Sequence, residues 1–300
     1  MSTSRLGSLV AFGLMVSACS DDAAVGSGKV RVQLEAEETI TQGLSKGDGV
    51  EDARDHAVSF SKYLVAVGHV QLGKPGKTLA DQSVYVADLK QVGAQGVQLG
   101  SFDDVAAGQW SEFGYELVVP DANARALDGV SSDDLQQMID NGWTYWIEGT
   151  VERAAADGGP VDFVLQTAVP TLFDHCGLDG QPGLAVTESG ATATITFHGD
   201  HIWFNSFPTG SEGTVERRTA WLLAADTDGD GKVSTEDLAA LDATEVFTSG
   251  LGYSLDGAPV VIESALDFVR AQLATQGHFK GEGECIWHYE GVDGAHDHEH

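Results

Sequence analysis

Apolar and polar residues alternate over short stretches in the first two thirds of the chain, a pattern typical of half-buried β-strands. Val30, Val32 and Leu34 share one face of such a stretch, and Phe113 and Tyr115 begin another. The pattern predicts strands at residues 29–35, 58–72, 83–87, 97–102, 112–119, 143–153, 161–167, 184–187 and 191–198. Frequent short strands separated by turn residues predict an antiparallel β-sandwich over residues 29–207.

Helical spacing of apolar residues is rarer and comes mostly after Phe207. A single helix is expected among the strands, at 131–141, where Ser131 is a candidate N-cap and Gly142 a candidate stop. Three more helices are expected at 214–225, 235–241 and 262–274. The chain is therefore expected to be mainly β with helices, an α+β protein whose β-sandwich is followed by a helical segment at 208–290.

A dense run of acidic residues joins the helices expected at 214–225 and 235–241. It reads Asp-Thr-Asp-Gly-Asp-Gly-Lys-Val-Ser-Thr-Glu-Asp and resembles the calcium loop of EF-hand proteins. The resemblance implies calcium ligands at Asp226, Asp228, Asp230, Lys232 (through its backbone carbonyl), Ser234 (through water) and Asp237. Gly231 fills the position that requires glycine. Asp237 stands where the family usually has Glu, and the shorter carboxylate implies weaker binding.

The alternative to a calcium site is an acidic, well-solvated turn. Four carboxylates this close repel one another strongly unless a cation lies among them, which favours the calcium site. The chain contains no second copy of the motif, although EF-hands usually pair. Calcium sensing of the calmodulin kind is therefore not implied.

The N-terminus has the features of a secretion signal: Arg5, then an apolar stretch at 6–16, then small residues. Val-Ser-Ala-Cys at 16–19 resembles the lipobox of bacterial lipoproteins. The resemblance implies cleavage before Cys19, acylation of Cys19 and, because Ser20 follows, retention in an outer membrane. The alternative is an ordinary signal peptide cleaved after Ala18. Residues 1–18 are thus expected to be the signal and 19–28 an acidic, Gly/Ser-rich tether.

The net charge of the chain argues against some classes of binding partner. There are 46 acidic and 16 basic residues, for a net charge of −30. Nucleic-acid binding requires a basic surface, so this balance argues against it. It also argues against adhesion to an anionic membrane through side chains, and it favours attraction of cations.

The three cysteines divide into one lipidation site and one pair. With Cys19 acylated, Cys176 and Cys285 remain, and in an oxidising compartment they are expected to form a disulfide. The alternative is a pair of thiolate metal ligands.

Four histidines lie in the second half of the chain near Gly or Cys, and we consider them as candidate ligands for copper or zinc. They are His175, His198, His201 and His278. Asp200 lies between the second and third and is a candidate ligand or supporting residue. The disulfide would bring the His175 loop near the segment that carries His278 and His288. The alternative is that these are structural, hydrogen-bonded histidines. The tail at 291–300 also alternates His with acid and is expected to be solvated.

The sequence lacks the nucleophile elbow, the phosphate loop and the dinucleotide-binding glycine pattern that identify common enzymes. We therefore expect a non-enzymatic, calcium-binding envelope lipoprotein with one structural EF-hand site. The alternative is a copper- or zinc-binding lipoprotein that uses the histidines, and a third hypothesis is a hydrolase without recognisable motifs.

Overall fold

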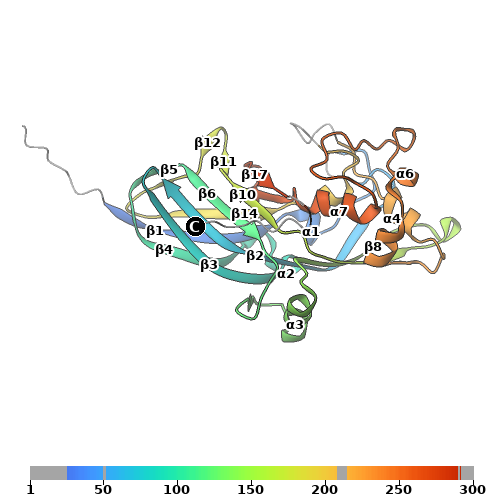
Figure 1. The fold of residues 1–300 in the computed structure, drawn as a ribbon, viewed down its shortest axis with the longest axis horizontal. Helices are drawn as coiled ribbons and strands as arrows, with labels where there is room; N and C mark the ends of the chain where they lie inside the picture. The colour runs from blue at the N-terminus through green and yellow to red at the C-terminus, as the bar shows by residue number, and fades with distance from the viewer. Residues whose placement is uncertain (1–25, 50–51, 208–214, 290, 292–300) are drawn as a thin grey trace, which may run out of the picture.

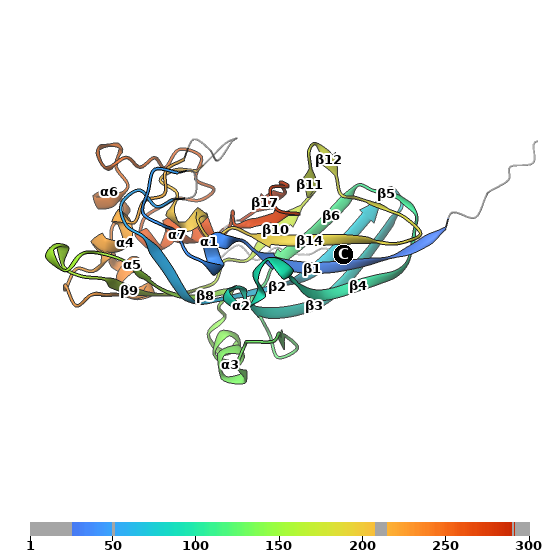
Figure 2. The ribbon, with the colours of Figure 1, turned by 180° about the vertical axis from the view of Figure 1, so that it is seen from behind.

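The structure is a computed structural model that describes residues 26–49, 52–207, 215–289 and 291. Strands dominate and a smaller number of helices accompany them, which confirms the expected α+β, β-rich fold. The strands of the N-terminal region extend toward one end of the molecule, and the helices of the C-terminal region gather at the other end (Figures 1 and 2).

The larger sheet has nine strands: β2 (Val58–Lys74), β3 (Lys77–Asp88), β6 (Glu112–Leu117), β7 (Arg125–Ala126), β8 (Tyr145–Val151), β9 (Val161–Thr167), β10 (Thr171–Asp174), β15 (Lys232–Val233) and β17 (Ile286–His288). Its main order is β15-β9-β8-β2-β6-β10-β17, and β3 pairs with β2 and β7. The first half of β2 pairs with β8, and its second half pairs with β3 and β6. The long strand β2 therefore organises the sheet.

The second sheet has four strands in the order β16 (Gly277–Phe279), β14 (Ala191–Phe197), β1 (Ser27–Ala36) and β4 (Val97–Ala106). β1 and β14 run parallel, as do β9 with β15 and β3 with β7, whereas the other pairs are antiparallel. Two small sheets pair β5 (Gly108–Trp110) with β13 (Leu184–Val186) and β11 (Gly177–Leu178) with β12 (Gln181–Pro182). The expected antiparallel pattern thus holds apart from three parallel pairs.

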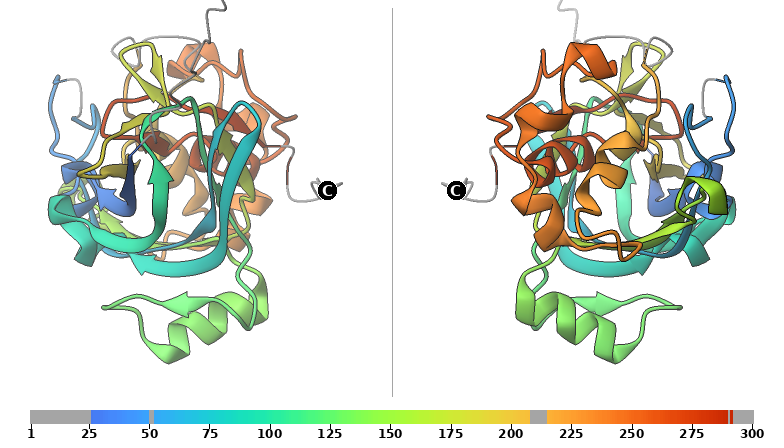
Figure 3. Two further views of the ribbon diagram at one scale, coloured as in Figure 1. Left: turned by 90° about the vertical axis from the view of Figure 1, so that its left-hand side faces the viewer. Right: turned by 90° about the vertical axis from the view of Figure 1, so that its right-hand side faces the viewer.

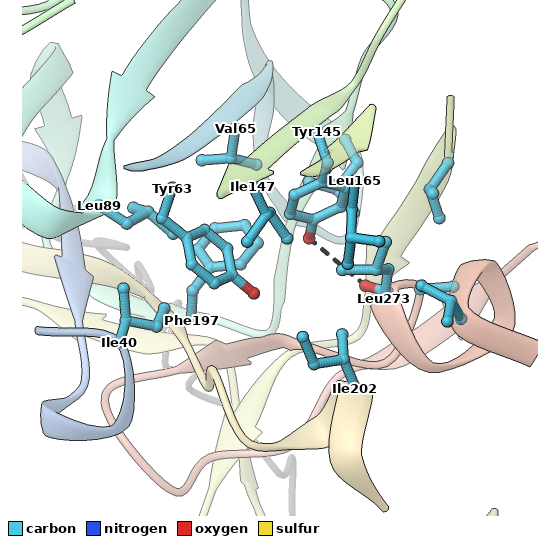
Figure 4. Close-up of a cluster of buried hydrophobic side chains, with 14 of the residues drawn as sticks. Ile40, Tyr63, Val65, Leu89, Tyr145, Ile147, Leu165, Phe197, Ile202 and Leu273 are labelled. Atoms are coloured by element: carbon cyan, nitrogen blue, oxygen red, sulfur yellow. Dashed lines mark hydrogen bonds between the residues drawn. The ribbon is translucent and has the colours of Figure 1, made fainter. Parts of the chain in front are cut away.

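One large hydrophobic core lies between the sheets and the C-terminal helices. Val30 and Leu34 from β1 join Tyr63 and Val65 from β2 and Leu273 from a C-terminal helix in the same buried cluster. The end-on views show strands curving around this interior (Figure 3). Figure 4 shows a section of it, where the hydroxyl of Tyr145 donates a hydrogen bond of 3.4 Å to the carbonyl of Leu273. The helical region therefore packs against the sheets through shared apolar residues.

Helix α3 (Ser132–Asn141) confirms the helix expected at 131–141. The Ser131 side chain accepts from the backbone N–H of Asp134, and Gly142 ends the helix in the left-handed conformation with a φ of 68°. Met138 packs with Leu64 and Ala66 of β2 in a second, smaller cluster. This contact explains why the middle of β2 does not alternate between buried and exposed residues. One face of the strand packs against the main core, and α3 covers the other face (Figure 1).

The C-terminal helices are shorter than their apolar patterns predict. The structure has α4 (Ala220–Ala225), α5 (Thr235–Ala240), α6 (Ala243–Val246) and α7 (Ala265–Leu273), with the 3₁₀ turns η3 (His201–Trp203) and η5 (Ser249–Leu251). Other short elements in the described residues are α1 (Glu38–Thr41), α2 (Leu89–Val92), η1 (Gly93–Gln95) and η2 (Ala155–Asp157). α4 begins later than expected because Arg217 forms bridges to Phe204 and Ala53 in an extended conformation. None of the helices in the described ranges is both long and apolar enough to cross a membrane.

Candidate metal centres

The acidic loop between α4 and α5 brings three carboxylates together. Asp226, Asp228 and Asp230 each offer a side-chain oxygen, and these oxygens lie within 4.8 Å of one another. The loop turns at Gly231, whose φ of 76° lies in the left-handed region that favours glycine. The N–H of Gly231 donates to Asp226 Oδ1 at 3.3 Å. The loop backbone is thus folded around the carboxylates by its own hydrogen bonds.

The end of the acidic loop is attached to the nine-stranded sheet. β15 pairs in parallel with β9, with Lys232 opposite Asp162 and Val233 opposite Phe163. The N–H of Asp162 also donates to the carbonyl of Gly231 at 2.9 Å. Val233 is 2% exposed, so the loop enters the core at this point. The acidic loop is therefore paired with strand β9 of the sheet through β15.

Ser234 and Asp237 form a capping box at the start of α5. The N–H and Oγ of Ser234 donate to Asp237 Oδ2 at 2.8 and 2.9 Å, and the N–H of Asp237 donates back to Ser234 Oγ at 3.3 Å. Asp237 is not a member of the group formed by the other three carboxylates. Asp237 thus caps α5, and coordination by Asp237 and Ser234, like that by the Lys232 carbonyl, stays a prediction.

A cavity of about 610 Å³ opens beside the acidic loop. Its walls come from β2, β8, β9 and the loop, and they include Glu148, Asp162, Asp228 and Lys232. Thr150 donates to Asp162 Oδ1 at 2.7 Å across this surface. Most of the charged side chains that line this cavity are acidic, so the cavity beside the loop attracts cations from solvent.

Three of the four candidate histidines converge in the interior. His198 follows β14, His201 lies in η3 and His278 lies in β16, and their exposures are 3%, 2% and 4%. One ring nitrogen of each lies within 4.8 Å of the others. The His198 and His278 rings stack with centroids 3.9 Å apart. We call these three residues the inner site. Three convergent imidazoles are a donor set that suits zinc or copper.

Gly277 allows β16 to lie close to the side chains of Tyr115 and Phe173. A Cβ added at Gly277 would lie 2.4 Å from the Tyr115 hydroxyl and 2.7 Å from the Phe173 ring. A larger residue would therefore push β16, and His278 with it, away from Tyr115 and Phe173.

The ring orientation of His201 is set by Thr275. The hydroxyl of Thr275 donates to the carbonyl of Gln272 at 2.8 Å, and its oxygen lies 2.8 Å from His201 Nδ1. Because the hydroxyl proton is already used, the oxygen can only accept from Nδ1–H. This fixes the neutral His201 ring with its lone pair on Nε2, the nitrogen it can give to a metal.

His198 is held by two acceptors. Its Nε2 lies 3.3 Å from Glu37 Oε1 and 3.3 Å from the carbonyl oxygen of Gly281. Both neighbours accept hydrogen bonds, so the neutral ring carries its proton on Nε2 and its lone pair on Nδ1.

The carboxylate of Asp200, between His198 and His201, forms an ion pair with Arg217. Arg217 donates to Asp200 Oδ2 from Nε at 2.8 Å and from a second nitrogen, and both side chains are 3% exposed. The Arg217 guanidinium also lies over the Phe204 ring, which stacks on His201. This buried ion pair fixes the turn between His198 and His201.

Tyr63 and Gln276 add a neutral polar contact to the same region. Burial raises the pKa of Tyr63 well above its usual range, so the hydroxyl stays protonated and donates to Gln276 Oε1 at 2.8 Å. The carbonyl of Gln276 accepts from the N–H of His198 at 3.1 Å.

His175 does not join the inner site, which corrects its place among the candidate ligands. Its side chain is 62% exposed and its Nδ1 lies 2.9 Å from Asp174 Oδ1. That hydrogen bond and charge raise the pKa of His175. The expected disulfide between Cys176 and Cys285 is present, and β10 pairs with β17 beside it. The disulfide brings the His175 loop near the segment that carries His278 and His288: the N–H of Gly177 donates to the carbonyl of Glu284 at 2.8 Å, and His288 Nε2 lies 3.4 Å from Asp174 Oδ2.

Glu37, Glu282 and Thr275 are additional residues of the histidine region that the sequence analysis does not identify. Glu37, His198 and Glu282 form a second group of side chains whose ligand atoms lie within 4.8 Å of one another and could hold a metal ion. Glu282 lies four residues after His278, and this spacing is the only local signal. Cys19 and the tail histidines lie outside the described residues. Comparisons of the chain with models of known protein families, with curated proteins and with solved structures give no match.

Proposed function

We propose that this chain is a non-enzymatic, calcium-binding lipoprotein of the bacterial envelope, with one structural calcium ion in the loop at 226–237. The observation that carries the proposal is the convergence of Asp226, Asp228 and Asp230 within 4.8 Å in a loop whose backbone pairs with β9. A divalent cation among these carboxylates relieves their mutual repulsion. Thermal denaturation with calcium and with a chelator tests the proposal.

A structural role follows from the position of the loop. The loop joins α4 to α5, and Trp221, Val233 and Leu238, which lie before, within and after it, are each at most 2% exposed. A bound ion would therefore hold two helices and one sheet edge in a single arrangement. Calcium concentrations outside cells are high enough for a weak site, of the kind found in extracellular modules, to be filled.

The envelope location rests on Cys19 and on the disulfide. The lipobox resemblance makes Cys19 the acylation site, and two or three acyl chains give stable anchoring without a transmembrane helix. A disulfide between Cys176 and Cys285 suits an oxidising compartment. Cys19→Ala is expected to remove the acyl chains, and mass spectrometry of the N-terminal peptide measures this directly. An acylated N-terminal peptide in the variant would contradict the assignment.

A second candidate function is binding of copper or zinc by the inner site. The specific support is the burial of His198, His201 and His278 in one group, with His201 oriented by Thr275 and His198 by Glu37. Metal analysis of the purified chain, after dialysis against trace copper and zinc, distinguishes calcium alone from calcium plus one transition metal. His296, His298 and His300 need to be replaced by Gln first, because the tail can bind metal by itself.

A further inference from the structure

A metal ion needs a route from solvent to the inner site, because His198, His201 and His278 are 3%, 2% and 4% exposed. A second group of metal-ligating side chains contains Glu37, His198 and Glu282, with one ligand atom of each within 4.8 Å of the others. Glu282 is exposed, Glu37 is half-buried and His198 is buried. His198 belongs to both groups. We call Glu37, His198 and Glu282 the outer site; it leads from the surface to the inner site.

Glu37 is held over His198 by a short chain of hydrogen bonds. The N–H of Gly199 donates to Thr39 Oγ1 at 3.0 Å, and this hydroxyl donates to Glu37 Oε2 at 3.3 Å. The N–H of Glu37 donates to the carbonyl of Phe197 at 3.1 Å. The backbone and the carboxylate of Glu37 are thus both attached to the segment that carries His198. This leaves Oε1 of Glu37 directed at the His198 ring.

Glu282 is placed by a tight turn after β16. Phe279 and Gly283 exchange two backbone hydrogen bonds of 2.8 and 2.9 Å, and the N–H of Gly281 donates to Thr196 Oγ1 at 2.9 Å. The turn is thereby attached to β14, and the carbonyl of Gly281 lies 3.3 Å from His198 Nε2. An exposed carboxylate is therefore held beside a buried imidazole by backbone geometry.

We propose that the outer site captures a divalent transition-metal ion from solvent and passes it to the inner site. This inference rests on the second proposed function above. Two carboxylates beside a neutral imidazole attract a divalent cation, and the net charge of −30 concentrates cations around the molecule. Without metal, His198 carries its proton on Nε2, which faces Glu37, so ligation in the outer site requires this proton to move to Nδ1, and ligation in the inner site requires it back on Nε2. Because a neutral imidazole has one lone pair, His198 can ligate a metal in only one of the two sites at a time. The two sites therefore serve one ion in succession.

Stopped-flow mixing of the full chain with copper(II) chloride tests the route, with quenching of tryptophan emission as the signal. Trp203 is buried two residues after His201 and reports on the inner site. All proteins carry H296Q, H298Q and H300Q. Glu282→Gln is compared with Glu284→Gln, which removes the same charge from another exposed carboxylate two residues away.

We expect Glu282→Gln to slow binding by about 10-fold relative to Glu284→Gln. Dissociation should slow by the same factor, because the ion leaves by the same route, so the dissociation constant stays unchanged. Glu37→Gln should slow binding and also weaken it by about 10-fold, since Glu37 orients His198. The stoichiometry should be one copper ion per chain.

Equal binding rates for Glu282→Gln and Glu284→Gln would overturn the route. A weaker affinity in Glu282→Gln with an unchanged dissociation rate, or two copper ions per chain, would also overturn it. If the reference protein binds no copper, the second proposed function fails and the route fails with it. This failure of metal binding can be distinguished from a failure of the route alone, because it is seen in the reference protein before any Glu variant is compared.

Discussion

Val233 of the acidic loop lies opposite Phe163 of β9, and through this pairing the candidate calcium site is joined to the sheet. Both side chains are buried, at 2% and 1% exposure. The contact continues into α5, where the N–H of Gln166 donates to Thr235 Oγ1 at 2.8 Å. The loop, the helix that leaves it and the sheet edge therefore form one hydrogen-bonded unit.

Thr235→Val tests this attachment. The substitution leaves the N–H of Gln166 without its hydrogen bond, so we expect a loss of about 1 to 2 kcal/mol in the free energy of unfolding. Urea denaturation measures the change. Thr235→Ser keeps the hydroxyl and should retain most of the stability. Equal losses in the Val and Ser variants would show that the hydroxyl contributes nothing.

Removal of the disulfide should destabilise the chain more than any single hydrogen bond. Cys176 and Cys285 are separated by 109 positions, and closing a loop of this length is worth about 4 to 5 kcal/mol in the chain-entropy model. We expect the double variant Cys176→Ala/Cys285→Ala to have a lower urea midpoint than the oxidised wild type. The reduced wild type should resemble the variant. An unchanged midpoint in both would contradict the expected contribution.

The pair His69–Glu116 predicts a pH-dependent contribution to stability. His69 Nδ1 lies 3.0 Å from Glu116 Oε2, and this hydrogen bond raises the pKa of His69 above its usual value of 6.5. A raised pKa means that the folded state binds the proton more tightly. The contribution is therefore full below pH 6.5 and is lost as the pH rises through the folded-state pKa.

His69→Asn is the appropriate variant, because His69 has a φ of 48° and Asn tolerates the left-handed region. The wild type should be more stable than the variant by a larger margin at about pH 5.5 than at about pH 8.5, values on either side of the ordinary His pKa. Glu116→Gln should reduce the same margin. Melting curves that differ by the same amount at both pH values would argue against the ion pair.

Thr275→Val tests the orientation of His201 separately from folding. Without the Thr275 oxygen, Nδ1–H of His201 loses its acceptor, and we expect copper affinity to fall by about 10- to 100-fold. Thr275→Ser keeps the acceptor and should bind copper normally, and calcium binding should be unchanged in both. Equal affinities for the Val variant and the wild type would remove Thr275 from the site.

The strands and the acidic loop were predictable because their signals are local. Alternation identifies β1 and β9, and the loop lies within twelve consecutive residues from Asp226 to Asp237. The pattern does not predict β10, β16 or β17, which have three or four residues and are too short to show alternation. Nor does it predict the parallel pairing of β1 with β14, which joins distant segments of the chain.

The histidine region was only partly predictable. The motif His-Gly-Asp-His identified His198 and His201, but nothing local separates His278, which joins them, from His175, which remains at the surface. Glu37 reaches His198 because Thr39 binds Gly199, a contact across 160 positions of sequence. Residues brought together by such long-range packing carry no local pattern.

The central claim is that the loop at 226–237 binds calcium and thereby stabilises the fold. The most direct measurement is the thermal unfolding of the full chain in saturating calcium and in chelator. At about a hundredfold excess over the dissociation constant, binding to the native state contributes about 2.7 kcal/mol, so the wild type should melt several degrees higher with calcium. Asp230→Ala should lose this difference, whereas Glu236→Ala, which removes an exposed carboxylate outside the group of three, should keep it. Identical melting temperatures for the wild type in calcium and in chelator would contradict the account and leave the loop as an acidic turn.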